Sequence, residues 1–209
     1  MTNPLAVLSE TNQYIAVNKP TGLIVEANPY ENSLEQEVHK HLHPNTYLGI
    51  IHRLDRVTSG VVLMAKRKGF LKSLNAQFAE GQIRKTYFAL VCKKPSEKAA
   101  TIEHYLLKNQ KEKRAEIFTT PHKNAKKVRL HYRIVRATNQ QFLLEIHPQT
   151  GKFHQSRSQL AAIGCPILGD VKYGGVAWNH KQTIGLHAGR LIFMHPSNGE
   201  KVFLKAEMP

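Results

Sequence analysis

The run from Ile83 to Cys92 constrains the fold most, because its side chains alternate between two faces along its length. A period of two residues is typical of a strand that is half-buried in a sheet. One face carries Arg84, Thr86, Phe88 and Leu90, and the other carries Lys85, Tyr87, Ala89 and Val91. The run therefore predicts a sheet that includes the middle of the chain.

The elements expected around this strand follow one another irregularly. Helices are indicated over 33–42, where Ser33 and Gln36 form a capping-box pattern, from Phe70 to just before Gly81, and over about 153–163. Residues 48–54 are expected to form a strand or a loop. Further strands are expected over 14–18, 61–65, 128–135, 142–147, 191–194 and 202–204. Because strands and helices do not alternate regularly, the expected class is α+β: one domain over residues 1–209, with flanking helices and loops around a mostly antiparallel sheet.

The charge of the chain points to a polyanionic partner. Thirty Lys and Arg stand against fifteen Asp and Glu, which gives a formal net charge of +15 at pH 7. With no membrane-length apolar run in the sequence, nucleic acid is the expected partner. The basic residues gather in two clusters, Lys108, Lys111, Lys113 and Arg114, then Lys123, Lys126, Lys127, Arg129 and Arg133. Pro121, His122 and Asn124 between them indicate an exposed hairpin or loop, either an arm that contacts phosphates or a solvated sheet edge.

Neither a metal site nor a disulfide framework is expected. Cys92 and Cys165 each lie in apolar sequence, and neither belongs to a CxxC pair. His39, His41 and His43 cannot share one face of a helix, because only residues three or four apart do so, and a solvated helix end is expected there. The first residues lack the basic start and apolar core of a signal peptide, so the expected location is the cytoplasm.

Residues 52–60, His-Arg-Leu-Asp-Arg-Val-Thr-Ser-Gly, place one of only two aspartates in the chain between two arginines. The positive charges of Arg53 and Arg56 favour the ionised form of Asp55. An ionised carboxylate on a turn before an apolar run is a candidate nucleophile or base. The alternative is a salt-bridged loop that braces a strand.

The stretch 52–60 resembles the HRLDRxTSG signature of RluA-type RNA pseudouridine synthases. Five further stretches resemble motifs of this family and lie in the family's order. They are residues 18–23 (NKPxGL), 85–91 (KxYxALV), 150–157 (TGRxHQIR), 164–174 (GxPIxGDxxYG) and 186–188 (LHA).

The resemblance implies the pseudouridine synthase fold and an isomerase that converts a uridine in structured RNA, ribosomal or transfer RNA, to pseudouridine without a cofactor or metal. It implies that Asp55 is the catalytic carboxylate, acting by covalent addition or by proton removal. Arg53 would hold the nucleotide or fill the space left by the flipped base, and Tyr87 would stack on the uracil or assist proton transfer. Arg157 would pair with Asp55 and orient it.

Some features depart from the family pattern. Lys152 replaces an arginine, and Ser156, Ser158 and Gln159 replace other usual residues, so the helix is expected to pack more loosely or to bind a different RNA surface. The NKPxGL-like element begins at Asn18, so no separate N-terminal RNA-binding domain is expected. The protein is expected to be a monomer.

Two alternatives remain at this point. One is an RNA-binding module without catalysis, which would not need Asp55, Tyr87 and Arg157 together. The other is a hydrolase that pairs Asp55 with a glutamate such as Glu26 or Glu80.

Overall fold

The computed structural model describes residues 5–138, 140–178 and 183–208, and the chain divides into two compact units. Unit 1 comprises Met1–Lys85 and His187–Pro209, and unit 2 comprises Thr86–Leu186. The unit boundaries fall within β5 (Arg84–Val91) and at the start of β10 (Leu186–Met194). That residues 1–209 form one catalytic domain without a separate N-terminal RNA-binding domain stays a prediction.

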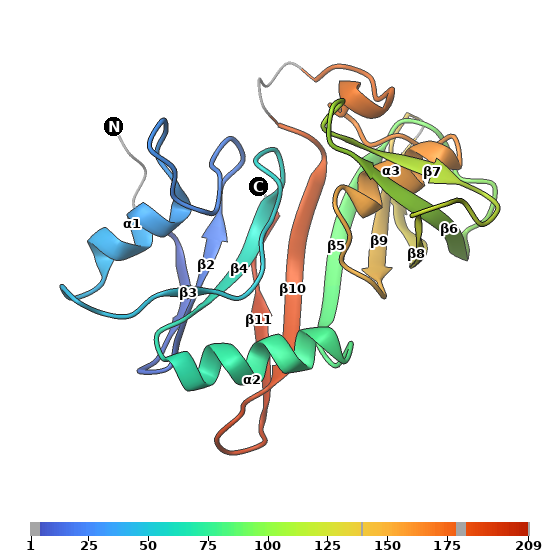
Figure 1. Cartoon of the computed structure of the whole chain (residues 1–209). Helices are drawn as coiled ribbons and strands as arrows, with labels where there is room; N and C mark the ends of the chain where they lie inside the picture. The colour runs from blue at the N-terminus through green and yellow to red at the C-terminus, as the bar shows by residue number, and fades with distance from the viewer. Residues whose placement is uncertain (1–4, 139, 179–182, 209) are drawn as a thin grey trace. The chain divides into compact units, whose positions relative to one another are not determined.

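Unit 1 is built on strands in the order β1-β2-β4-β10 (Figure 1). Their bounds are β1 (Val7–Glu10), β2 (Tyr14–Lys19) and β4 (Ser59–Ala65), while β3 (Gly49–Ile50) pairs with β4 and β11 (Lys201–Lys205) pairs with β10. The β4–β10 pairing is parallel, and the other strand pairs of this unit are antiparallel. The strands expected over 14–18, 61–65, 191–194 and 202–204 are confirmed.

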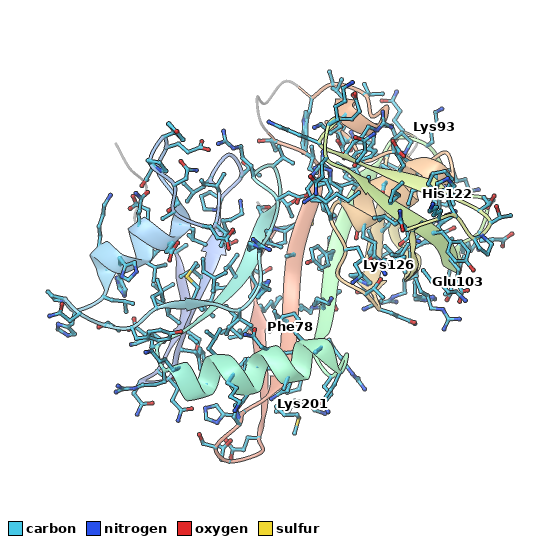
Figure 2. All side chains as sticks on the ribbon, in the orientation of Figure 1. Phe78, Lys93, Glu103, His122, Lys126 and Lys201 are labelled. Carbon is cyan, nitrogen blue, oxygen red and sulfur yellow. The ribbon has the colours of Figure 1, made fainter. Side chains whose placement is uncertain are left out.

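The core of unit 1 forms where β4 meets α2 (Lys68–Ala79). Every residue of β4 is buried, as its apolar run predicts. On α2, Phe70 and Leu74 are buried against Leu63, while Phe78 (labelled in Figure 2) packs at the edge of this core. Gly81 follows the helix with a φ of 71°, the left-handed conformation that favours glycine after a helix end.

The helix α1 (Leu34–His41) begins where its capping box predicts. The Ser33 side chain accepts from the Gln36 amide, and the Gln36 side chain accepts from the Ser33 amide. His39, His41 and His43 are exposed, and His41 lies 2.9 Å from a carboxylate oxygen of Glu10. The expected solvated helix end is confirmed.

Unit 2 is an antiparallel sheet in the order β5-β9-β8-β6-β7. The bounds are β9 (Phe142–Pro148), β8 (Lys126–Ala137), β6 (Ala99–Asn109) and β7 (Arg114–Phe118). Alternate residues of β8, namely Val128, Leu130 and Tyr132, are buried. The helix α3 (Gln155–Ala162) contacts β6, β7, β8 and β9, and the short 3-10 helix η1 (Val171–Tyr173) contacts α3.

The α+β class with a mostly antiparallel sheet is therefore confirmed, but the strand list was incomplete. No strand was predicted over β1, β6 or β7. The expected exposed loop is found at residues 119–125, between β7 and β8, where Pro121, His122 and Asn124 are exposed.

Candidate active site

Asp55 lies half-buried on the loop between β3 and β4, and both the turn and the end of that loop are fixed. The Thr58 amide donates to the Asp55 carbonyl oxygen at 3.0 Å. Gly60 has a φ of 118°, and a Cβ added there would lie 2.3 Å from the Ala188 carbonyl oxygen. Only glycine tolerates this conformation and this close approach to the Ala188 backbone. The end of the loop is therefore held against β10 at Gly60.

A buried lysine ties this loop to the turn of residues 20–23. Lys19 is 0% exposed, and its Nζ donates to the carbonyl oxygens of Pro20 at 2.8 Å, Leu23 at 2.7 Å and Arg56 at 3.2 Å. Burial lowers the pKa of Lys19 to about 7, the Asp55 carboxylate opposes that lowering, and Arg56 adds to it. The motif at residues 18–23 is thus a support for the Asp55 loop. Sequence analysis missed this role, for which the only sequence signal is a lysine ending an apolar strand.

The two arginines that flank Asp55 each bind a glutamate from the loop between β2 and α1. An Nη atom of Arg53 lies 2.6 Å from a carboxylate oxygen of Glu26, and Arg56 forms an ion pair with Glu31. Both pairs are solvent-exposed, where ion pairs typically contribute about 0–1 kcal/mol. Glu26 therefore has a local partner in Arg53. That the arginines favour ionised Asp55 stays a prediction.

Two neutral histidines brace the strand after the loop. The His187 Nε2 donates to the Ala206 carbonyl at 3.1 Å, so its Nδ1 accepts from the Ser59 hydroxyl at 2.8 Å, and burial lowers the pKa of His187. The His52 Nε2 accepts from the Leu63 amide at 3.1 Å. Burial lowers the pKa of His52 to about 4, with a smaller lowering by Lys85. Both rings therefore act here as hydrogen-bonding supports.

In unit 2, Arg157 forms a bidentate ion pair with Asp170 that sequence analysis did not foresee. Its Nε lies 2.7 Å from Oδ2 and its Nη2 lies 2.8 Å from Oδ1 of Asp170. The two side chains are 6% and 1% exposed. The pair joins α3 to the residue before η1 and accounts for the aspartate of the motif at residues 164–174. The pairing of Arg157 with Asp55 stays a prediction.

Tyr173 extends this buried network. Its ring lies 5.2 Å from the Arg157 guanidinium and 5.6 Å from that of Arg114. Its hydroxyl accepts from the Ala115 amide at 2.7 Å and lies 2.8 Å from the His154 Nδ1. The network therefore links α3, η1 and β7.

Tyr87 lies on β5 opposite Ile146 of β9 and is half-buried. The strand predicted for this residue is confirmed. Its stacking on uracil and its part in proton transfer stay predictions.

The α3 residues that depart from the family pattern are buried. The Ser158 hydroxyl donates to the carbonyls of His154 and Gln155, and the Gln159 amide donates to the Ile102 carbonyl at 3.3 Å. Ser156, Ser158 and Gln159 are 9%, 3% and 0% exposed. They therefore contribute to packing, and Ser158 also lines a cavity beside β7.

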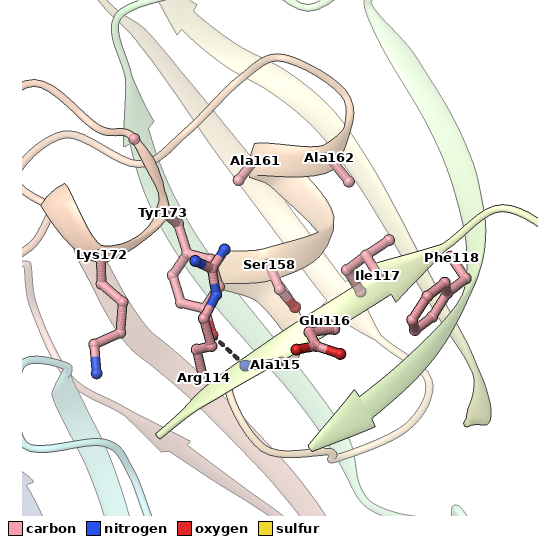
Figure 3. A pocket seen from close by; sticks show the side chains of 11 residues that line it. Arg114, Ala115, Glu116, Ile117, Phe118, Ser158, Ala161, Ala162, Lys172 and Tyr173 are labelled. Atoms are coloured by element: carbon pink, nitrogen blue, oxygen red, sulfur yellow. Dashed lines mark hydrogen bonds between the residues drawn. The ribbon is translucent and has the colours of Figure 1, made fainter. Parts of the chain in front are cut away.

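A cavity of about 630 Å³ lies beside β7 in unit 2 (Figure 3). Figure 3 shows Ala161 and Ala162 of α3 on one side, Glu116, Ile117 and Phe118 of β7 on the other, and Arg114 across the Tyr173 ring. With Lys172 also in its lining, this cavity combines two cations with one carboxylate.

The predicted arm, residues 108–133, presents its basic side chains to solvent. Lys123 and Lys126 are exposed (Lys126 is labelled in Figure 2), while Lys127 and Arg129 both pair with Glu103. The His122 ring stacks on Phe118 with centroids 3.9 Å apart. Within the described ranges, no group of three or more His, Cys, Asp or Glu could hold a metal ion. No helix in the described part of the chain is long and apolar enough to span a membrane.

Comparison with known proteins identifies the family. A family model described as RNA pseudouridylate synthase matches residues 13–162. The chain is 33% identical over 210 residues to ribosomal large subunit pseudouridine synthase C of Buchnera aphidicola subsp. Acyrthosiphon pisum, covering 97% of this chain and 67% of that protein. It is 31% identical over 227 residues to tRNA pseudouridine synthase C of Haemophilus ducreyi, covering 97% and 90%.

A solved structure agrees with these matches. Human RNA pseudouridylate synthase domain containing 1 has a TM-score of 0.81 and 25% identity, with 98% of this chain and 84% of that chain covered. The chain spans about two thirds of the length of three of the ribosomal relatives that it matches. On the family match and these identities, the chain belongs to the RNA pseudouridylate synthase family.

Proposed function

We propose that this chain isomerises a uridine of structured RNA to pseudouridine, with Asp55 as the catalytic carboxylate. The observation that carries the proposal is the geometry of the Asp55 loop, which is held at the Arg56 carbonyl by Lys19 and at its end by Gly60. A half-buried carboxylate on a loop that is held directly after it is preorganised for chemistry. The family match over residues 13–162 supports the reaction type.

The proposed substrate is ribosomal or transfer RNA. The support is the names of the relatives, which act on the ribosomal large subunit and on tRNA. The net charge of +15 and the exposed lysines of the arm suit a polyphosphate partner. We also propose that the protein acts as a monomer in the cytoplasm.

The reaction breaks the bond between N1 of uracil and C1′ of the sugar and forms a bond between C5 and the same C1′. The proton on C5 leaves to solvent and N1 gains a proton, so atoms and electrons balance without an oxidant or reductant. The uridine must first leave its stack, which costs a few kcal/mol in a duplex and less in a loop. Asp55 either adds covalently or removes a sugar proton, and no cofactor or metal is proposed.

Three further residues are proposed to bind the substrate. Arg53 is exposed and can exchange its Glu26 partner for the nucleotide or fill the place of the flipped base. Tyr87 would stack on the uracil or move a proton at the base. Arg157, already held in a fixed orientation by Asp170, would orient Asp55.

The test is release of tritium from RNA that carries tritium at C5 of uridine. Isomerisation releases tritium to water and leaves the base attached to the chain. An RNA-binding module would retain the RNA and release nothing, whereas a hydrolase would yield free uracil or cleaved RNA. The structure gives the two candidate glutamates of a hydrolase other local partners, because Glu26 pairs with Arg53 and Glu80 accepts from the side-chain Nε2 of Gln82 at 2.7 Å.

A further inference from the structure

The loop of residues 24–33, between β2 and α1, presents one aromatic side chain almost entirely to solvent. Tyr30 is 93% exposed, more than any other large hydrophobic residue in the described ranges. A single exposed aromatic residue is ordinary on a protein surface. What sets Tyr30 apart is the rigidity of the loop that carries it and the place to which that loop is anchored.

The tip of the loop is cross-braced by its own hydrogen bonds. The Asn28 Oδ1 accepts from the amides of Tyr30 at 2.8 Å and Glu31 at 3.1 Å, and Asn28 and Glu31 form a β-bridge. The Ala27 amide donates to a carboxylate oxygen of Glu35 on α1 at 2.7 Å. The backbone on both sides of Tyr30 therefore has little freedom, although the ring buries almost nothing.

The same loop is anchored to the catalytic loop. Glu26 pairs with Arg53 and Glu31 pairs with Arg56, the two residues that flank Leu54 and Asp55. Tyr30 is adjacent to Glu31 in the chain, so its position is set relative to the reacting carboxylate by one ion pair and the turn. All of these contacts lie within unit 1.

We propose that Tyr30 is a stacking platform for an unpaired base of the RNA, next to the uridine that Asp55 acts on. Because the backbone that carries it already has little freedom, an exposed ring loses only its own rotamer freedom when a base stacks on it. A phosphate beside that base would meet Arg53, whose exposed ion pair with Glu26 exchanges readily for phosphate, while the Arg56–Glu31 pair keeps the loop in place. The inference rests on the proposed function, because the stacked base belongs to the RNA that carries the target uridine.

The test measures binding of a fluorescein-labelled RNA stem-loop with one uridine in its loop, by fluorescence anisotropy. Tyr30→Ala should raise Kd roughly tenfold, the loss typical of one base–aromatic stack. Tyr30→Phe should keep the parent Kd, because the ring remains. The slope of log Kd against log salt should not change in Tyr30→Ala, since no charge is lost. Phe203→Ala is the matched control, because Phe203 is a 68% exposed aromatic residue of unit 1 on β11.

Abasic RNAs identify the stacked base. When that base is removed from the loop, Tyr30→Ala should no longer weaken binding, whereas abasic positions elsewhere should leave the tenfold effect intact. An unchanged Kd in Tyr30→Ala, a loss matched by Phe203→Ala, or an equal effect on every abasic RNA would each overturn the proposal. Tritium release by the parent keeps the two proposals apart. If the parent releases tritium but Tyr30→Ala binds RNA as the parent does, only the stacking platform is rejected. If the Tyr30→Ala effect depends on the abasic position but the parent releases no tritium, only the isomerase is rejected.

Discussion

At Asp55 the backbone is held by hydrogen bonds at its own carbonyl and at the next one, so a change confined to the carboxylate should leave the loop in place. The Thr58 amide holds the Asp55 carbonyl, and Lys19 holds the Arg56 carbonyl. Asp55→Asn keeps the shape and removes only the reactive group. We expect tritium release to fall by at least about a hundredfold, the lower range for a positioned acid or base. RNA affinity, measured by anisotropy, should stay near that of the parent. Release within tenfold of the parent would remove Asp55 from the catalytic role.

Arg157 and Asp170 form the buried charge pair of unit 2, and their energies should be coupled. Removing one partner of a buried pair leaves an uncompensated charge, which costs about 3–5 kcal/mol. Arg157→Ala and Asp170→Ala should each lower the free energy of unfolding by that amount, while the double variant should recover much of the loss. Arg157→Lys keeps the charge but loses the planar fork, so it should fall between these values. Urea unfolding of the four proteins completes the cycle, and strictly additive losses would show that the pair is not coupled.

His52 should make the protein less stable in acid. Burial lowers its pKa to about 4, below the ordinary value of 6.5 that it regains when unfolded. Between these two pH values the unfolded chain binds a proton that the folded chain lacks, so stability falls as pH drops from about 6.5 to about 4. The expected loss is about 2–3 kcal/mol. His52→Gln keeps an acceptor for the Leu63 amide without titrating, and it should flatten this part of the curve in urea unfolding. Parallel curves for parent and variant would assign the acid sensitivity to other groups.

At the scale of elements, prediction succeeded where a local pattern and the fold agree. The capping box at Ser33 and the apolar run 61–65 mark α1 and β4 without any tertiary information. β6 and β7 were missed because only some of their residues are buried. On β6 only His104 and Leu106 are buried, and the residues on either side are half-buried or exposed. β6 is defined by its pairing with β8, and β7 by its pairing with β6, which a linear pattern does not reveal.

The same limit applies to the site. Asp55 and Tyr87 could be named as candidates because their motifs are contiguous, and the strand that carries Tyr87 is confirmed. The Arg157–Asp170 pair, the support by Lys19 and the ion pairs of Arg53 and Arg56 depend on residues up to 37 positions apart in the chain. No spacing rule selects those partners in advance.

The basic arm allows a prediction at this scale. Replacing Lys123, Lys126 and Lys127 with Ala should reduce the slope of log Kd against log salt by about two to three, because each phosphate contact contributes nearly one. The effect of Lys127 should be the smallest, since it is paired with Glu103 at 2.8 Å. Replacing the exposed lysines Lys40, Lys72 and Lys201 of unit 1 is the control of equal charge. Equal reductions of the slope in the two triple variants would show that net charge alone causes the effect. An unchanged slope in the variant of Lys123, Lys126 and Lys127 would exclude the arm from RNA binding.

For the whole molecule, the proposed reaction and the proposed residues both predict activity without an added cofactor. Moving the C1′ bond from N1 to C5 requires a reactive carboxylate, a way to expose the base and proton exchange with water. Asp55, the proposed binding residues Arg53, Tyr87 and Arg157, and solvent supply these in principle. The purified chain should therefore release tritium from a prefolded RNA stem-loop after dialysis against a chelator and with no added nucleotide or organic cofactor.

Mg²⁺ also stabilises folded RNA, so two controls separate an effect on the RNA from one on the enzyme. One is the same reaction with Mg²⁺ added back, and the other uses a stem-loop that is stable at high monovalent salt. The rates should differ by less than about threefold for the stable stem-loop. Activity that disappears with the chelator on this RNA and returns only with a metal ion would show that the carboxylate does not act alone, and Asp55 would then have to be reconsidered as part of a metal-assisted site.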